Sequence, residues 1–142
     1  MASVLVDTAT FVDYLIDRNR LNAEALEWMD AALQDGSLKI SAVTLLQFSE
    51  MSRLGRLTDD ARRRIYERLV DVPVEPIDTN VIRRLPNIPD GIAFADRIVA
   101  ATGLVTNTIV VTANVGLKMV DRLHVILSPA GTFEVRVVAS DS

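Results

Sequence analysis

The clearest indication of the fold is the stretch VLVDT at residues 4–8. Its three apolar residues lack the alternation of a half-exposed strand, and such a run is typical of a parallel strand that is buried on both faces. The polar pair that follows ends the strand and begins a helix, with Thr8 or Ala9 expected near the N-cap. Asp7 therefore stands at the carboxyl end of a buried strand, which is where open α/β sheets bind their ligands.

Further apolar runs alternate with amphipathic stretches along the rest of the chain. Strands are expected at 38–41, 74–77, 109–112 and 125–127, and helices at about 22–34, 43–54, 58–70, 78–85, 93–104 and 114–121. Strands that alternate with helices form a parallel sheet through right-handed crossovers. The sequence therefore predicts one α/β domain over residues 1–142, whose core at 3–127 is a three-layer α/β/α sandwich around four to five parallel strands.

The end of the chain carries a different pattern. Phe133, Val135 and Val137 alternate with polar residues, which predicts a short extra strand in the C-terminal extension 128–138. The apolar face of that strand needs a cover, from the edge of its own sheet or from another subunit.

The composition excludes several kinds of site. The 142 residues include no cysteine and one histidine, His124, so neither a disulfide framework nor a cysteine or multi-histidine metal centre can form. The formal net charge is −4, so nucleic acid could bind only through a local patch. The arginine-rich segment 53–68 is either such a patch or a solvated helix face with internal ion pairs.

The sequence also bears on the compartment. No apolar run is long enough to span a membrane, and the N-terminus lacks the basic flank and cleavage site of a signal peptide. We therefore expect a cytoplasmic protein without membrane contact.

Oxygen-bearing side chains are expected at the carboxyl ends of several strands. They are Asp7 after the first strand, Thr112 and Asn114 at the end of the strand at 109–112, Asp96 at the start of a helix, and Gln47 and Glu50 on one face of the helix at 43–54. These groups could converge in one crevice, and carboxylate oxygens suit Mg²⁺ or Mn²⁺, which activate water for phosphodiester hydrolysis. Each acid also has a plainer alternative role, as a helix cap or a surface ion-pair partner.

Four blocks of sequence resemble those of PIN domains, and in particular the toxin nucleases of VapBC-type toxin–antitoxin pairs. The blocks lie at 4–8, at 40–48 with 54–57, at 92–102 and at 110–114, so the resemblance covers about residues 3–127. It implies a parallel sheet flanked by helices and a Mg²⁺- or Mn²⁺-dependent ribonuclease. It also implies an RNA substrate, a VapB-like antitoxin as partner, and a homodimer.

The resemblance implies Asp7 and Asp96 as metal ligands, and Gln47, Asn114 and Thr112 as further catalytic positions. The family normally has acids where Gln47 and Asn114 stand here, and a small polar residue where Ala9 stands. Each lost carboxylate removes an attraction to the ion of the order of several kcal/mol before desolvation is counted. We therefore expect Mg²⁺ or Mn²⁺ to bind weakly, unless Glu50 replaces a missing acid.

Two hypotheses about function follow. The first is a toxin-like endoribonuclease with a depleted acidic site and weak activity. The alternative is a catalytically inactive PIN-fold protein that binds or regulates, because an amide cannot act as a general base toward water. A third class, a phosphate-binding regulator, is disfavoured because no glycine-rich loop follows the first strand.

Overall fold

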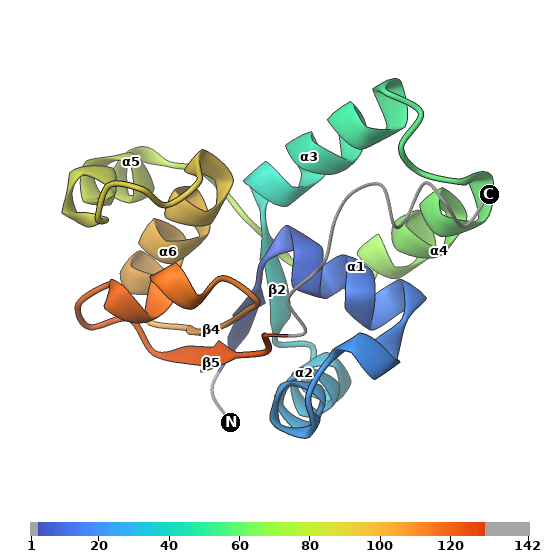
Figure 1. Cartoon of the computed structure of the whole chain (residues 1–142), viewed down its shortest axis with the longest axis horizontal. Helices are drawn as coiled ribbons and strands as arrows, with labels where there is room; N and C mark the ends of the chain where they lie inside the picture. Colours follow the sequence, from blue (N-terminus) through green and yellow to red (C-terminus); the bar gives the residue numbers. More distant parts are fainter. Residues whose placement is uncertain (1–2, 130–142) are drawn as a thin grey trace.

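The structure is a computed structural model that describes residues 3–129, and these form a central sheet with helices on both sides (Figure 1). The described part of the sheet has five strands, all parallel, in the order β3-β2-β1-β4-β5. Their bounds are β1 Val4–Val6, β2 Leu38–Ser41, β3 Val74–Glu75, β4 Ile109–Thr112 and β5 Val125–Leu127. The predicted three-layer α/β class is therefore confirmed.

The first strand occupies the middle of the sheet. It pairs with β2 on one side and β4 on the other, and Val6 lies in register with both Ile40 and Val111. All three residues of β1 are completely buried, as expected of a strand that is covered on both faces. The register brings the carboxyl ends of β1, β2 and β4 to the same edge of the sheet.

Six α-helices and three short 3₁₀ helices connect the strands in the described residues. The α-helices are α1 Thr8–Ile16, α2 Ala23–Asp35, α3 Ala42–Arg53, α4 Asp59–Leu69, α5 Thr79–Arg84 and α6 Phe94–Thr106; the 3₁₀ helices are η1 Arg18–Arg20, η2 Leu85–Asn87 and η3 Val115–Met119. The expected helices are present with bounds shifted by one or two residues. The helix expected at 114–121 is the 3₁₀ helix η3, and η1 and η2 were not predicted from the sequence.

The N-cap of α1 differs from the expected one. Asp7, rather than Thr8 or Ala9, caps the helix, because its side chain accepts a hydrogen bond from the backbone amide of Thr10. The residue that ends β1 therefore also begins α1. A carboxylate at this position satisfies a helix donor and interacts favourably with the helix dipole.

Two apolar cores fill the space between the sheet and the helices. On one face, α1, α2 and α4 contribute Phe11, Met29 and Ile65, and on the other α5 and α6 contribute Val81 and Val99. Figure 1 shows these two groups of helices on opposite sides of the strands. The alternation of side chains along β1 serves both cores, with Val4 and Val6 in the first and Leu5 in the second. 

Two further expectations concern the C-terminal strand and membrane-spanning segments. The strand expected from Phe133, Val135 and Val137 lies outside the described residues. Within residues 3–129, no helix has the length and apolar character that crossing a bilayer requires.

A glycine sets the distance between α6 and the sheet. A Cβ atom on Gly103 would lie 2.6 Å from Cγ2 of Val110 and 2.9 Å from Cδ1 of Leu123, closer than side chains tolerate. Val110 is completely buried in β4 and cannot move away without disturbing the core. The close approach of α6 to β4 therefore depends on a residue without a side chain.

Replacing this glycine should destabilise the protein. In Gly103→Ala the gain in helix propensity is up to about 1 kcal/mol, whereas overpacking costs about 1–3 kcal/mol. We expect the free energy of unfolding, measured by urea denaturation, to fall by about 1–2 kcal/mol. Ser49→Ala, at an exposed position of α3, is the control and should leave stability unchanged or slightly higher. A Gly103→Ala protein as stable as the wild type would contradict this packing.

Candidate active site

Asp7 is the deepest acid at the carboxyl edge of the sheet. Its side chain is 3% exposed, and both carboxylate oxygens accept hydrogen bonds. Oδ1 accepts from the backbone amide of Thr10 at 2.8 Å, and Oδ2 accepts from the hydroxyl of Thr112 at the end of β4. The first acid of the predicted site is thus held from two directions by its own helix and by the neighbouring strand.

Burial raises the pKa of Asp7 above its usual value of 3.8, because the carboxylate loses the water that would stabilise its charge. The hydrogen bonds from Thr10 and Thr112 oppose this rise in the pKa, and the negative charge of Asp96 adds to it. Asp96 lies in the first turn of α6, on the opposite face of the sheet from α1. The two acids therefore belong to elements on opposite faces of the sheet, and their connection depends on the residues between them.

Asn114 connects these two acids. Its backbone amide donates to Oγ1 of Thr112 at 3.0 Å, and its side-chain Nδ2 donates to Oδ2 of Asp96 at 2.8 Å. Its Oδ1 accepts from the backbone amide of Gly116 at 2.9 Å, which caps η3. A hydrogen-bonded path therefore runs from Asp7 through Thr112 and Asn114 to Asp96.

Gln47 joins the site through two threonines, Thr8 and Thr44, that were not among the predicted site residues. Thr8 donates its hydroxyl to Oε1 of Gln47 and lies 2.8 Å from the hydroxyl oxygen of Thr44. Thr44 precedes Gln47 by three residues in α3, so the two side chains lie on the same helix face. That spacing, and the place of Thr8 directly after Asp7, are the signals that could have identified both threonines.

Three residues of this hydrogen-bonded network, Thr8, Gln47 and Asp96, reach an open cleft of about 290 Å³. It is lined by Thr8, Ala9, Gln47, Glu50, Met51, Leu54, Arg56, Ala93, Ala95 and Asp96. Glu50 lies at its rim, where the side chain is 56% exposed and its Oε2 lies 2.6 Å from Nη2 of Arg53. The hydrogen bond from Arg53 lowers the pKa of Glu50. Glu50 is therefore already paired with a cation and is not directed toward Asp7 or Asp96 by any of these contacts.

The donor set does not fit the divalent cation that the family resemblance implies. Within residues 3–129, no three side chains from acids, histidine and cysteine are grouped so that they could hold a metal ion. Asp7 uses both oxygens for hydrogen bonds, and Asn114 presents N–H hydrogens, rather than an oxygen, toward Asp96. An amide hydrogen carries partial positive charge and repels a cation, so we derive no chemical step through a metal.

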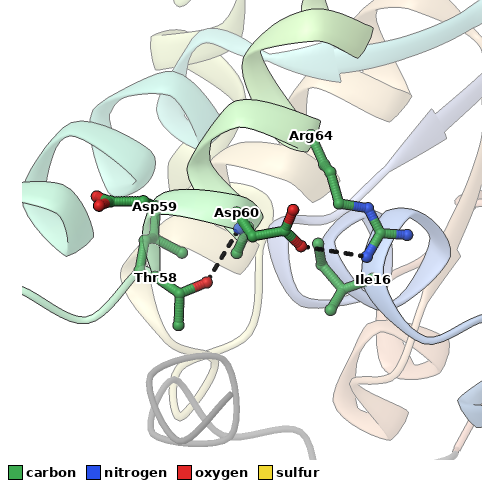
Figure 2. Close-up of a pocket in the computed structure, with 7 residues that line it drawn as sticks. Ile16, Thr58, Asp59, Asp60 and Arg64 are labelled. Atoms are coloured by element: carbon green, nitrogen blue, oxygen red, sulfur yellow. Dashed lines mark hydrogen bonds and ion pairs between the residues drawn. The ribbon is translucent and has the colours of Figure 1, made fainter. Parts of the chain in front are cut away.

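A larger cavity, of about 690 Å³, lies elsewhere, between the end of α1 and the start of α4. Figure 2 shows Ile16 from the end of α1 beside the side chain of Arg64, with Thr58, Asp59 and Asp60 from the start of α4. None of the predicted site residues lines it, so its size does not make it the candidate active site.

Several arginines of the arginine-rich segment form ion pairs with acids of the same helix. In α4, Arg62 pairs with Asp59 at 2.8 Å and Arg63 pairs with Asp60 at 2.5 Å, and Figure 2 shows Asp60 reaching Arg64 as well. These contacts favour the interpretation of the segment as a solvated helix face with internal ion pairs. Such exposed pairs contribute little to stability, about 0–1 kcal/mol each.

Removing the charge of Asp7 should stabilise the protein at neutral pH. The folded-state pKa is raised above 3.8, so ionisation opposes folding once the pH exceeds that pKa, and the effect disappears below 3.8, where the carboxyl is protonated in both states. Asparagine caps a helix about as well as aspartate. We therefore expect Asp7→Asn to raise the free energy of unfolding at neutral pH but not in acid, as measured by urea denaturation.

Asp78→Asn is the matched control for this prediction, because Asp78 is an exposed N-cap, on α5. It should change stability little at either pH. An Asp7→Asn variant that is less stable than the wild type at neutral pH would show that the hydrogen bonds of Asp7 outweigh the cost of its burial.

Several solved structures have a fold similar to that of this chain. The structure is similar to VapBC2 from Rickettsia felis bound to a promoter DNA fragment, with a TM-score of 0.71, 11% identity, and coverage of 87% of this chain and 97% of that chain. FitAcB from Neisseria gonorrhoeae has a TM-score of 0.63 and 24% identity over 90% and 99% of the two chains. A toxin–antitoxin complex from Klebsiella pneumoniae has a TM-score of 0.62 and 18% identity over 87% and 96%.

At these identities the structural likeness establishes the fold. No curated protein matches the chain in sequence. Residues 4–123, however, match the PIN domain family, and this match includes β1 with Asp7, α3 with Gln47, the start of α6 with Asp96, and Asn114 after β4. The chain therefore belongs to the PIN domain family.

Proposed function

We propose that this chain is the toxin-type member of a toxin–antitoxin pair. It retains the ability to bind RNA, but its metal-dependent RNA cleavage is depleted. The observation that carries the proposal is the hydrogen bond of 2.8 Å from Nδ2 of Asn114 to Oδ2 of Asp96. A hydrogen-bond donor stands where a nuclease of this family is expected to have a carboxylate. The site is thus closer to the binding or regulatory alternative than to an active nuclease.

The charge of the cleft supports this proposal. Asp7 and Asp96 are the two carboxylates joined by the hydrogen-bonded path, and Glu50 is paired with Arg53. Phosphodiester hydrolysis needs a base that activates the attacking water. It also needs a positively charged group beside the phosphate that stabilises the developing negative charge. The Gln47 and Asn114 amides supply neither a base nor the negative charge that would hold a divalent cation.

The structural neighbours support an antitoxin as the partner. Among them are VapBC2 bound to promoter DNA and a toxin–antitoxin complex from Klebsiella pneumoniae. We therefore propose a VapB-like antitoxin as the partner of this chain, in the cytoplasm. RNA as the cleft's ligand and a homodimer as the assembly stay predictions from the family resemblance.

Slow RNA cleavage is a second candidate function, and one observation favours it. Hydrogen bonds through Thr112 and Asn114 still join two carboxylates, Asp7 and Asp96, in one site. If a divalent ion were held there at high concentration, the chain would retain the weak endoribonuclease activity expected from the sequence.

An RNA cleavage assay in excess Mn²⁺ decides between the two. We expect the wild-type protein to cleave single-stranded RNA at least about 100-fold more slowly than the variant Gln47→Glu/Asn114→Asp, which regains the family's acids. The gain should disappear when Asp7→Asn is added to that variant. The measurement is the initial rate of product formation, with RNA binding followed in parallel by fluorescence anisotropy.

Two outcomes of this assay would support or overturn the proposal. Wild-type RNA binding without cleavage supports the proposal that binding remains. A wild-type rate equal to that of Gln47→Glu/Asn114→Asp, abolished by Asp7→Asn alone, would establish the chain as an active nuclease and overturn the proposal.

A further inference from the structure

Two carboxylates in one partly buried hydrogen-bonded network need compensation for their charge. Asp7 is 3% exposed, and hydrogen bonds through Thr112 and Asn114 connect it to Asp96. In a metal site the cation would provide the compensation. Here the described contacts of the two acids are hydrogen-bond donors from the protein itself, namely Thr10, Thr112 and Asn114.

The orientation of the Asn114 side chain follows from its neighbours. The oxygen and nitrogen of an amide are distinguished by what they contact, and a backbone N–H can only donate. Gly116 donates its N–H at 2.9 Å to one end of the carboxamide, so that end is Oδ1. The other end, at 2.8 Å from Asp96, is therefore the NH₂ group.

The backbone around Asn114 is shaped for this arrangement. A Cβ atom on residue 116 would lie 3.0 Å from Oδ1 of Asn114, which is tighter than an ordinary contact. The backbone N–H of Asn114 is also engaged, with Thr112 at 3.0 Å. Both ends of the side chain and the backbone amide are thus fixed, so the amide is held in place toward Asp96.

We infer that the Asn114 carboxamide takes the place of the divalent cation in this cleft, so that the site is complete without a metal ion. Its NH₂ group neutralises part of the charge of Asp96, and its backbone N–H supports the threonine that donates to Asp7. The inference deepens the proposed function because it concerns the same cleft. The experiments that test it measure stability and metal binding rather than activity.

An aspartate at position 114 would reverse this situation. In the observed geometry it would bring a carboxylate oxygen to 2.8 Å from Oδ2 of Asp96. Two carboxylates at that separation cannot both stay ionised unless a cation lies between them. A cation that bound Oδ2 of Asp96 in the wild type would instead have to displace the Asn114 amide, and turning the amide oxygen toward the cation would also break the bond from Gly116. Partly buried hydrogen-bonding groups would then be left unpaired.

Thermal unfolding with and without Mn²⁺ tests the inference. The wild-type protein should have the same midpoint in EDTA and in millimolar Mn²⁺. Asn114→Asp should unfold roughly 5–10 °C lower than the wild type in EDTA, and Mn²⁺ should recover most of that loss. Asn87→Asp makes the same chemical change at an exposed site outside the cleft and should show neither effect.

Calorimetric titration of Mn²⁺ into the wild-type protein needs no variant. The expected result is no saturable heat. Saturable binding that Asp96→Asn abolishes, or an Asn114→Asp protein as stable in EDTA as the wild type, would overturn the inference. If Asn114→Asp does not fold in EDTA, purification in Mn²⁺ throughout should yield folded protein that unfolds when the metal is removed.

The two proposals fail in different ways. Saturable Mn²⁺ binding by the wild type without RNA cleavage would remove the inference about Asn114 and leave the proposed binding function. Rapid RNA cleavage without Mn²⁺ binding would remove the proposed function and leave the inference.

Discussion

The hydrogen bond from the hydroxyl of Thr112 to the carboxylate of Asp7 joins the ends of two adjacent parallel strands and positions the rest of the cleft. It continues the pairing of β1 with β4, in which the backbone amide of Asp7 donates to the carbonyl of Val111 at 3.2 Å. Groups more than a hundred residues apart are thereby brought together at the edge of the sheet. Asp7 also begins α1, so the same carboxylate ties a strand, a helix and a neighbouring strand into one rigid unit.

Hydrogen-bond donors without formal charge connect this unit to the rest of the site. Thr112 passes the connection to the backbone of Asn114, and the Asn114 side chain passes it to Asp96. Asp96 belongs to α6, which can approach the sheet closely because Gly103 has no side chain. Packing and hydrogen bonding therefore set the positions of both acids, and the amide satisfies the demand that a cation would otherwise meet.

Much of the fold was predictable because its signals are local. The buried runs at 4–6 and 109–112 are apolar on both faces, and the strands occur where expected. Helix ends were predictable only to within one or two residues. The remaining error arises because frayed ends and 3₁₀ turns are not encoded by periodicity. The N-cap of α1 was placed one or two residues too late, because a strand-ending aspartate and a helix-capping aspartate look alike until the backbone angles are known.

The parallel sheet and the set of oxygen-bearing groups at its edge could be predicted from the sequence, because residue periodicity and strand ends are properties of neighbours along the chain. The four sequence blocks were likewise enough to indicate the family. The sequence also showed that amides replace two expected acids, which lowers the charge whatever the detailed geometry. The three-dimensional arrangement was needed to show which end of the Asn114 amide faces Asp96. It also showed that Thr8 and Thr44 hold Gln47 and that Glu50 pairs with Arg53. These choices depend on side-chain directions and on partners from other elements, which no local pattern in the chain encodes.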